Sequence, residues 1–443
     1  MEMVLEFLRD VLSQPALLIG IMSCIGLIAL KRPFHKIMTG TLKPILGYLM
    51  LAAGAGVIVS NLDPLGKMIE HGFHITGVVP NNEAIVAVAQ KVLGVETMSI
   101  LVVGLLMNLC IARFTKFKYV FLTGHHSLFM ACLMSAVLGT AGLSGMELIL
   151  VGGFLMGAWS AISPAIGQSY TSKVTDGDEI AIGHFGSLGY YLSAWVAKYV
   201  GKAEDSTEDI EIPEKWGFLR DSTLSTALTM IVFYLIAAFA AGSEFVATLS
   251  GDMSPYLYAV MSAMNFAVGV TIVYSGVRMI LGDLIPAFQG IATKIIPNAI
   301  PAVDCAVFFT YAPTAVVLGF LSSFIGGIIG MLILGAVGGV LIIPGLVPHF
   351  FCGATAGIYG NATGGRRGAA VGAFLNGLAI TFLPALALPV LGQLGFQNTT
   401  FGDADFAVMG LVLGNAYEWV GMAGIYGIVA IAALVLIVPN FIK

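Results

Sequence analysis

The chain has 443 residues, of which 58% are hydrophobic and only 10% are charged. Soluble domains carry a charge on about 25% of their residues, so this composition excludes an ordinary soluble fold and predicts a protein embedded in lipid. The net charge of −5 comes without any basic cluster of the kind that nucleic acid requires, so we expect no nucleic-acid partner. Five scattered cysteines show no metal-ligand spacing, and we expect no metal and no cofactor.

Apolar stretches long enough to cross a bilayer recur along the whole chain. They predict an all-α polytopic membrane protein with about eleven transmembrane helices. The expected spans are residues 15–30, 41–61, 97–112, 128–144, 146–163, 223–248, 256–282, 306–336, 338–352, 369–391 and 407–440. The runs 306–336 and 407–440 are too long for one straight helix and are expected to contain breaks.

Basic residues predict how these spans are oriented. Lys31, Arg32 and Lys36 lie between the first two spans, and Arg113 and Lys118 follow the third. Cytoplasmic loops are enriched in such residues. We therefore expect both loops in the cytoplasm and the N-terminus outside, with the first span retained rather than cleaved as a signal peptide.

Residues 201–221 form the most polar stretch, with seven acidic side chains against three basic ones. This stretch divides the chain into halves of similar length. It is typical of a solvated cytoplasmic linker, and the alternative is a docking surface for a cytoplasmic partner.

The two halves show weak self-similarity. A shift of 222 residues aligns six identical residues between the stretches 47–69 and 269–291, among them two glycines and a proline, which set backbone shape. The same shift places Asn82 on Asp304. The expected spans put an odd number of crossings between the copies, which inverts the second copy, as in many secondary transporters. Chance matching in a glycine-rich chain is the alternative.

Ionisable side chains inside apolar runs are functional candidates, since each costs about 2.5–3.5 kcal/mol to place at mid-bilayer. His125 and His126 precede the span 128–144, and their imidazoles suit a hydroxylated ligand. An interfacial histidine pair is the alternative. Asp304 is the only acid between Asp283 and Asp403, so we expect it either to be paired or to hold a ligand.

A further candidate is His184, which follows the polar stretch 174–179. We expect a re-entrant loop here and a half-helix over 185–200, because irregular backbone at membrane depth must line a cavity or be buried in protein. An ordinary cytoplasmic loop is the alternative. The stretch 353–368 is rich in small residues and contains Asn361, and we expect it to be structural.

Six segments together resemble one family, the membrane subunit (enzyme IIC) of the ascorbate-type phosphotransferase system. They are LTGH at 122–125, VTDG at 174–177, IGH at 182–184, AVDCA at 302–306, YAPTAVVLGF at 311–320 and IIPGLVPHFF at 342–351. The resemblance runs over nearly the whole chain. It implies a homodimer of multi-pass subunits in the bacterial inner membrane, in which a core domain carries substrate past a V-motif domain in an elevator-type movement.

On this resemblance, the V-motif domain takes residues 1–61 and 222–283, and the core takes residues 62–200 and 284–443, which include the terminal helix. The resemblance also implies a separate cytoplasmic enzyme IIB, phosphorylated on cysteine, that donates phosphate to the incoming solute. Few residues follow position 440, so we expect only the IIC part here, a transport subunit without catalysis of its own.

The family's substrate contacts fall on residues that are only partly retained. Its two binding histidines fall on His125 and His184, and its binding aspartate falls on Asp304. A threonine–tyrosine pair of the ascorbate members is replaced by Asn82 and Glu83, and two glutamines are replaced by phenylalanines. The expected substrate-binding residues are Asn82, Glu83, His125, His126, Phe129, His184, Phe185 and Asp304, with Asp304 or His184 as a proton acceptor.

These features predict a IIC subunit that moves ascorbate, or a related small sugar, polyol or sugar acid, inward for phosphorylation by IIB. The alternative is an ion-coupled secondary transporter of a small hydroxylated solute, without phosphorylation, in which the same histidines or Asp304 carry protons. A membrane receptor or channel without a transport cycle is a third hypothesis.

Overall fold

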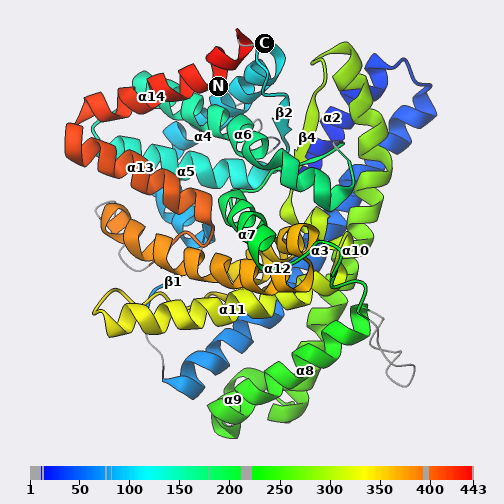
Figure 1. The fold of residues 1–443 in the computed structure, drawn as a ribbon, viewed down its shortest axis with the longest axis vertical. Helices are drawn as coiled ribbons and strands as arrows, with labels where there is room; N and C mark the ends of the chain where they lie inside the picture. The colour runs from blue at the N-terminus through cyan, green and yellow to red at the C-terminus, as the bar shows by residue number, and fades with distance from the viewer. Residues whose placement is uncertain are drawn as a thin grey trace.

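The computed structural model describes residues 11, 14–74, 77–80, 82–177, 179–210, 222–392 and 399–441, and it is almost entirely helical (Figure 1). Its α-helices are α2 (Pro15–Ala29), α3 (Phe34–Phe73), α4 (Asn82–Phe114), α5 (Gly124–Thr140), α6 (Gly145–Thr175), α7 (Ser187–Val200), α8 (Ser222–Ala241), α9 (Ser243–Ser250), α10 (Pro255–Lys294), α11 (Pro313–Ala336), α12 (Leu346–Gly392), α13 (Ala404–Val420) and α14 (Met422–Ile437). Short strands and 3₁₀ turns connect them: β1 (Val79–Pro80), β2 (Tyr119–Phe121), β3 (Ala181–Ile182), β4 (Ile300–Val303), β5 (Thr399–Thr400), η2 (Cys305–Thr310) and η3 (Val438–Asn440).

Seven helices in the described part of the chain are long and apolar enough to cross a membrane. They are Phe34–Phe73, Val95–Phe114, Gly145–Thr175, Pro255–Leu284, Pro313–Ala336, Leu346–Pro389 and Met422–Asn440. An eighth results if α8 and α9, which meet at 116°, form one broken span. The all-α, multi-pass membrane architecture is therefore confirmed, whereas the count of eleven crossings stays a prediction.

The two runs expected to contain breaks do contain them. Residues 305–310 form the 3₁₀ turn η2 before α11 begins at Pro313, and Gly421, with φ of +64°, separates α13 from α14. The expected span 338–352 is wrong over its first half, because no helix forms before Leu346. Gly338 has φ of +72°, and Pro344 lacks the N–H that a helix needs and disfavours helical backbone before it.

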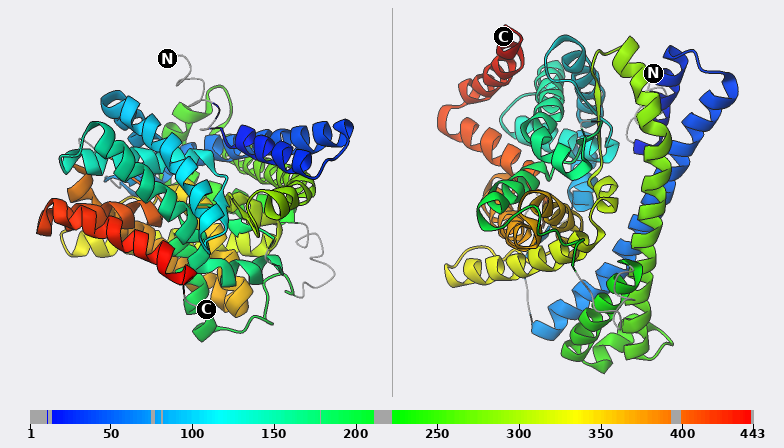
Figure 2. Two further views of the ribbon diagram at one scale, coloured as in Figure 1. Left: turned by 90° about the horizontal axis from the view of Figure 1, so that it is seen from above. Right: turned by 45° about the vertical axis from the view of Figure 1, so that its right-hand side comes forward.

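The helices form two packed groups. The first, called the slab, consists of α2, α3, α8, α9 and α10, and the second, called the bundle, consists of α4–α7 and α11–α14. Figure 2 shows the slab as a long layer along one side of the bundle. The domain boundaries expected at 61 and 283 fall inside α3 and α10, which continue to Phe73 and Lys294.

Glycines allow α3 and α10 to cross in backbone contact. A Cβ atom on Gly47 would lie 2.9 Å from the carbonyl oxygen of Gly276, and one on Gly54 would lie 2.8 Å from that of Gly269. The 222-residue shift aligns Gly47 with Gly269 and Gly54 with Gly276. In the structure each glycine contacts the partner of the other pair, Gly47 with Gly276 and Gly54 with Gly269. Only a residue without a side chain fits such a close approach.

Two small parallel sheets connect distant parts of the bundle. In the first, β4 lies between β2 and β3, with Val120 opposite Pro301 and Ile182 opposite Val303. In the second, β1 pairs with β5, and a single β-bridge joins Val78 to Ile342. Because every pairing is parallel, the carboxyl ends of neighbouring strands lie at the same edge.

The acidic stretch begins as ordered structure packed on the bundle. The Gly365 backbone, with φ of +58°, breaks α12, and there the carbonyl oxygen of Asp205 accepts a 2.8 Å hydrogen bond from the Arg366 N–H. The Glu208 carboxylate accepts bonds of 3.1 Å from the N–H groups of Thr314 and Ala315 at the start of α11. Residues 201–210 are thus anchored, and residues 211–221 of the expected linker lie outside the described chain.

Candidate functional site

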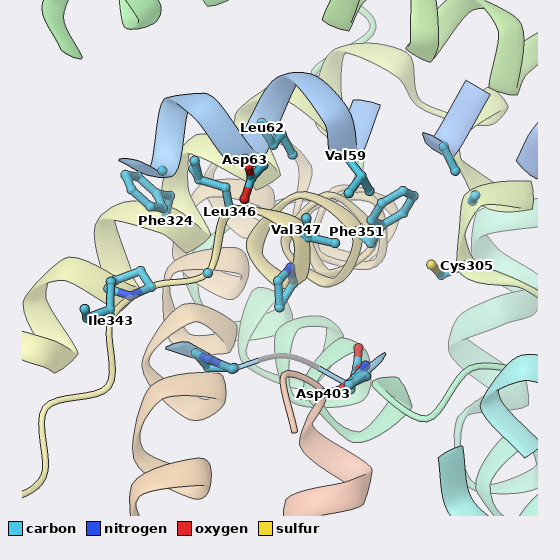
Figure 3. Close-up of a pocket in the computed structure, with 18 of the residues that line it drawn as sticks. Val59, Leu62, Asp63, Cys305, Phe324, Ile343, Leu346, Val347, Phe351 and Asp403 are labelled. Carbon is cyan, nitrogen blue, oxygen red and sulfur yellow. The ribbon is translucent and has the colours of Figure 1, made fainter. Parts of the chain in front are cut away.

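A cavity of about 1420 Å³ lies between the slab and the bundle. Figure 3 shows Leu62 and Asp63 of α3 on one side of it, Cys305 at another, and Asp403 opposite α3. Six of the expected site residues line this cavity: Asn82, His125, His126, Phe129, His184 and Asp304.

The first parallel sheet brings three of these residues together. His125 follows β2, His184 follows β3 and Asp304 follows β4, so the parallel pairing places all three at one sheet edge. A ring nitrogen of His184 and a carboxylate oxygen of Asp304 lie within 4.8 Å of each other. Their convergence from positions 120 residues apart is the geometry that a shared ligand site requires.

Asp304 is held by the turn that it begins. Its Oδ1 accepts a 3.3 Å hydrogen bond from the N–H of Ala306, as an N-terminal cap of η2. Its Oδ2 lies 3.5 Å from Nε2 of His125, an ion pair when that imidazole is protonated. The Asp304 side chain is largely buried but still reaches the cavity.

Backbone amides fix the tautomers of two histidines. Nδ1 of His184 accepts from the N–H of Gly186 at 3.1 Å and lies 2.8 Å from the Tyr190 hydroxyl. Nδ1 of His126 accepts from the N–H of Phe185 at 3.3 Å. A neutral imidazole whose Nδ1 accepts must carry its proton on Nε2. Both residues line the cavity.

Sequence reasoning missed a second carboxylate. Asp403 follows β5 and lines the same cavity, while being 96% buried. Its Oδ2 accepts from the Asn82 amide at 2.5 Å, and its Oδ1 accepts from the Cys352 thiol at 2.7 Å. Asp403 follows a glycine shortly after β5, just as His184 follows a glycine shortly after β3. A glycine and a polar residue after a short strand are the sequence signal that could have revealed Asp403.

Asn82 is oriented by contacts at both ends of its amide. Its Oδ1 accepts a 2.9 Å bond from the N–H of Gly402, while its Nδ2 donates to Asp403. Asn82 therefore holds the carboxylate of Asp403 in place. The side chain of Glu83, its expected neighbour in the site, lies outside the described part of the structure.

The two phenylalanines occupy different places. Phe129 lines the cavity, with its ring 5.7 Å from that of His125 in an edge-on arrangement. Phe185 is fully buried, and its ring stacks on Phe121 with 4.6 Å between centroids. Phe185 contacts the site behind His126, through the backbone N–H that it donates to that ring and through its own ring, 6.1 Å from the imidazole.

Two sets of side chains meet the distance requirement for a metal ion. They are His184, Asp304 and Cys305, and His184, Cys352 and Asp403. Both depend on His184, whose Nδ1 already accepts from Gly186 and whose Nε2 therefore carries the proton. A metal-bound histidine normally donates a hydrogen bond from its other ring nitrogen, whereas Nδ1 of His184 accepts one, so the donor set fits a hydrogen-bonding ligand better than an ion.

Comparison with known proteins gives two findings. The profile of the EIIC-GAT family, described as the PTS system sugar-specific permease component, matches residues 10–405. The chain is also similar to a protein of Mycoplasma pneumoniae named "Ascorbate-specific PTS system EIIC component", with 28% identity over 417 residues. That match covers 80% of this chain, and the chain spans 62% of the relative's length.

Proposed function

The chain belongs to the EIIC-GAT family of phosphotransferase-system sugar-specific permease components, and we propose that it is the substrate-translocating IIC subunit of such a system. It moves a small hydroxylated solute of the sugar, polyol or sugar-acid class across the bacterial cytoplasmic membrane. A separate cytoplasmic IIB protein phosphorylates the solute as it arrives. The observation that carries this proposal is the convergence of His125, His184 and Asp304 in one cavity.

The position of the cavity supports an elevator-type movement. The bundle supplies the three converging residues, while the slab contributes a wall that includes Tyr48 and Leu62 of α3. A solute held mainly by one group of helices can travel with that group along the other. In the proposed cycle the bundle moves and the slab stays fixed, as the scaffold of a homodimer.

The glycine contacts support two inverted repeats. α3 and α10 are both 40 residues long, and their aligned glycines meet crosswise, Gly47 with Gly276 and Gly54 with Gly269. A two-fold relation between the helices produces this reciprocal pattern. Inverted repeats place the substrate at the interface of the copies, where the cavity lies.

In the proposed phosphorylation step, Asp304 is the proton acceptor. A solute hydroxyl attacks the phosphorus of phosphocysteine on IIB, an O–P bond forms, and the S–P bond breaks to leave the thiolate. The hydroxyl proton passes to a carboxylate. Asp304 suits this role better than His184, because Nδ1 of His184 already accepts from the N–H of Gly186 and its Nε2 therefore carries a proton.

Uptake into bacterial cells tests the proposal. Cells that express the chain are compared in hosts with and without the general phosphocarrier of the phosphotransferase system, using labelled ascorbate, pentoses, hexitols and sugar acids. We expect uptake of one of these solutes that requires the phosphocarrier. Asp304→Asn is expected to weaken solute binding by about 10- to 100-fold, since it removes a charged hydrogen-bond partner.

Asp252→Asn serves as the matched control, because this aspartate is exposed on the slab, and uptake is expected to stay unchanged. Uptake that persists without the phosphocarrier but collapses with an uncoupler would favour the ion-coupled transporter instead. Unchanged affinity in both Asp304→Asn and His184→Ala would place the solute elsewhere.

A further inference from the structure

The turn between α2 and α3 carries basic side chains that have no part in the proposed solute site. Lys31, Arg32 and Lys36 are all exposed there. The chain has no acidic residue between Gln14 and Leu62, and none of the three forms an ion pair with another described residue. Their charge is therefore uncompensated within the described part of the chain, and such a surface attracts anions.

Close packing fixes the position of this turn. A Cβ atom on Gly40 of α3 would lie 2.7 Å from the Leu27 side chain of α2. The helix α2 also packs against α10, where Gly26 contacts the backbone of Ala287 and Gly290. Figure 2 shows the turn at one end of the slab, clear of the bundle. The basic side chains are thus held at a fixed corner of the slab.

The backbone of the turn keeps a lysine where glycine would fit more easily. The N–H of Lys31 donates to the carbonyl of Ile28 at 2.8 Å, and that of Arg32 donates to the carbonyl of Leu27 at 3.1 Å. These two bonds form a Schellman motif, whose left-handed position is usually glycine. Lys31 occupies that position with φ of +54°. A charged side chain kept in a strained backbone conformation indicates a function for its charge.

The turn lies where the apolar part of α2 ends. Each of the two helices has a row of exposed apolar side chains at helical spacing that leads to the turn: Leu17, Ile21, Ile25 and Ile28 on α2, and Met38, Leu42, Leu46 and Leu49 on α3. Phe34, within the turn, is 76% exposed. Basic and aromatic residues at the end of an apolar span are typical of the level of the lipid headgroups.

A phospholipid with an anionic headgroup matches both parts of this surface. Its phosphate accepts charged hydrogen bonds from lysine and arginine, and its acyl chains cover the apolar rows below. An acidic soluble protein would match the basic residues but leave the apolar rows uncovered. A second copy of the chain on this face would place two basic turns at the same membrane level, with like charges facing each other.

From these observations we infer that the turn between α2 and α3 is a binding site for anionic phospholipid. Lys31, Arg32 and Lys36 hold the headgroup, and the Phe34 ring lies beside it at the interface. In the proposed cycle, such a lipid holds the slab in place while the bundle moves. The inference goes beyond the proposed function and is independent of which solute is carried.

Lipid binding to the purified full chain tests this assignment. Dioleoyl phosphatidylglycerol or dioleoyl phosphatidylcholine, which differ in headgroup charge, is added to the protein in detergent micelles, and native mass spectrometry measures how much lipid is retained. We expect phosphatidylglycerol to be preferred, and the preference to weaken as the ammonium acetate concentration rises. Each basic residue at such a surface contributes about fivefold in affinity.

The triple variant Lys31→Gln, Arg32→Gln and Lys36→Gln should therefore bind phosphatidylglycerol about 100-fold more weakly than the unchanged chain. The matched control removes three exposed basic residues of the bundle, with Lys173→Gln, Lys202→Gln and Arg366→Gln. It changes the net charge equally and should keep the preference for phosphatidylglycerol.

Lys31→Gly separates charge from folding. Glycine relieves the left-handed backbone, so we expect a melting temperature that is unchanged or higher, together with about fivefold weaker binding of phosphatidylglycerol. This single variant decides the question if the triple variant does not fold.

Equal binding of the two lipids by the unchanged chain would overturn the inference, and so would an equal loss of affinity in the bundle control. Full lipid affinity in the turn variants, with either phosphocarrier-dependent uptake or the dimer lost, would assign the turn to a protein partner or to a second copy instead. The proposed function is tested separately, by the phosphocarrier dependence of uptake through the unchanged chain.

Discussion

Tyr48 of α3 reaches across the cavity to His125 of α5, with its hydroxyl 3.4 Å from Nδ1 of the imidazole. The same histidine faces Asp304 through its other nitrogen at 3.5 Å. One imidazole therefore connects the slab to the carboxylate at the sheet edge. In the proposed movement of the bundle along the slab, this contact belongs to the position that the structure describes.

Tyr48→Phe tests the importance of that contact. Removing a hydroxyl from a hydrogen bond costs about 0.5–1.5 kcal/mol, so we expect solute affinity to fall by at most about tenfold, with an altered uptake rate and a melting temperature lower by at most about 3 °C. Titration calorimetry measures the affinity, cell uptake measures the rate, and thermal melting measures the stability. Tyr199→Phe, on an exposed side chain of α7, is the control. Equal affinity and uptake in Tyr48→Phe would show that the contact is incidental.

Gly47→Ala tests the crossing of α3 and α10. The new methyl group would meet the backbone of Gly276 and Ile280 at 2.9 Å, and overpacking of this kind costs about 1–3 kcal/mol. We expect a lower melting temperature in detergent. Gly56→Ala is a matched control in the same helix, since nothing lies within 4 Å of its added carbon. A Gly47 variant as stable as the Gly56 variant would argue against close backbone contact.

Asp405→Ala tests how the loop that carries His184 is held. The Asp405 carboxylate accepts from the Ser187 hydroxyl at 2.8 Å, the Leu188 N–H at 2.9 Å and the Trp159 indole at 3.2 Å. Leaving buried donors unpaired costs about 1–3 kcal/mol each. We therefore expect lower thermal stability together with weaker solute binding.

Ser187→Ala removes only one of these three partners and provides a graded comparison. Its loss in melting temperature should be smaller than that of Asp405→Ala, with affinity nearly retained. An Asp405 variant that is destabilised but binds solute normally would separate this carboxylate from the position of His184.

Glu208→Gln tests the anchoring of the acidic stretch. The Glu208 carboxylate caps the start of α11 through Thr314 and Ala315, and such contacts at a helix N-terminus contribute about 0.5–2 kcal/mol. We expect a lower melting temperature and faster proteolytic cleavage between residues 201 and 221. Glu204→Gln, on an exposed residue of the same segment, should change neither. Identical cleavage rates in the two variants would contradict the anchoring.

Much of the site could be found from sequence because polar groups are costly in lipid. Asp304 interrupts an apolar run, His125 stands just before one, and His184 stands between a polar stretch and an amphipathic one, so each is marked by its position without any knowledge of the fold. Asp403 escaped notice because it lies among the polar residues that precede α13, where one more acid creates no contrast. Asp403 reaches the cavity wall next to Asn82 because β1 pairs with β5.

The small sheets themselves could not be predicted. Strands of two to four residues are too short to show an alternating pattern, and their partners lie up to 320 residues away. The false helical start at 338 has a similar origin. Hydropathy there is as high as in a span, and only Gly338, Pro344 and Gly345 indicate extended backbone.

The middle strand of the larger sheet, β4, comes from the second half of the chain, while both of its neighbours come from the first half. During synthesis, therefore, the loops with His125 and His184 enter the membrane long before the segment that joins them. The first half cannot complete the proposed binding pocket on leaving the ribosome, because residues of the second half, as far along as Asp403, also line the cavity. Expressed as two separate polypeptides, the halves should be inactive alone and regain binding when they are made together.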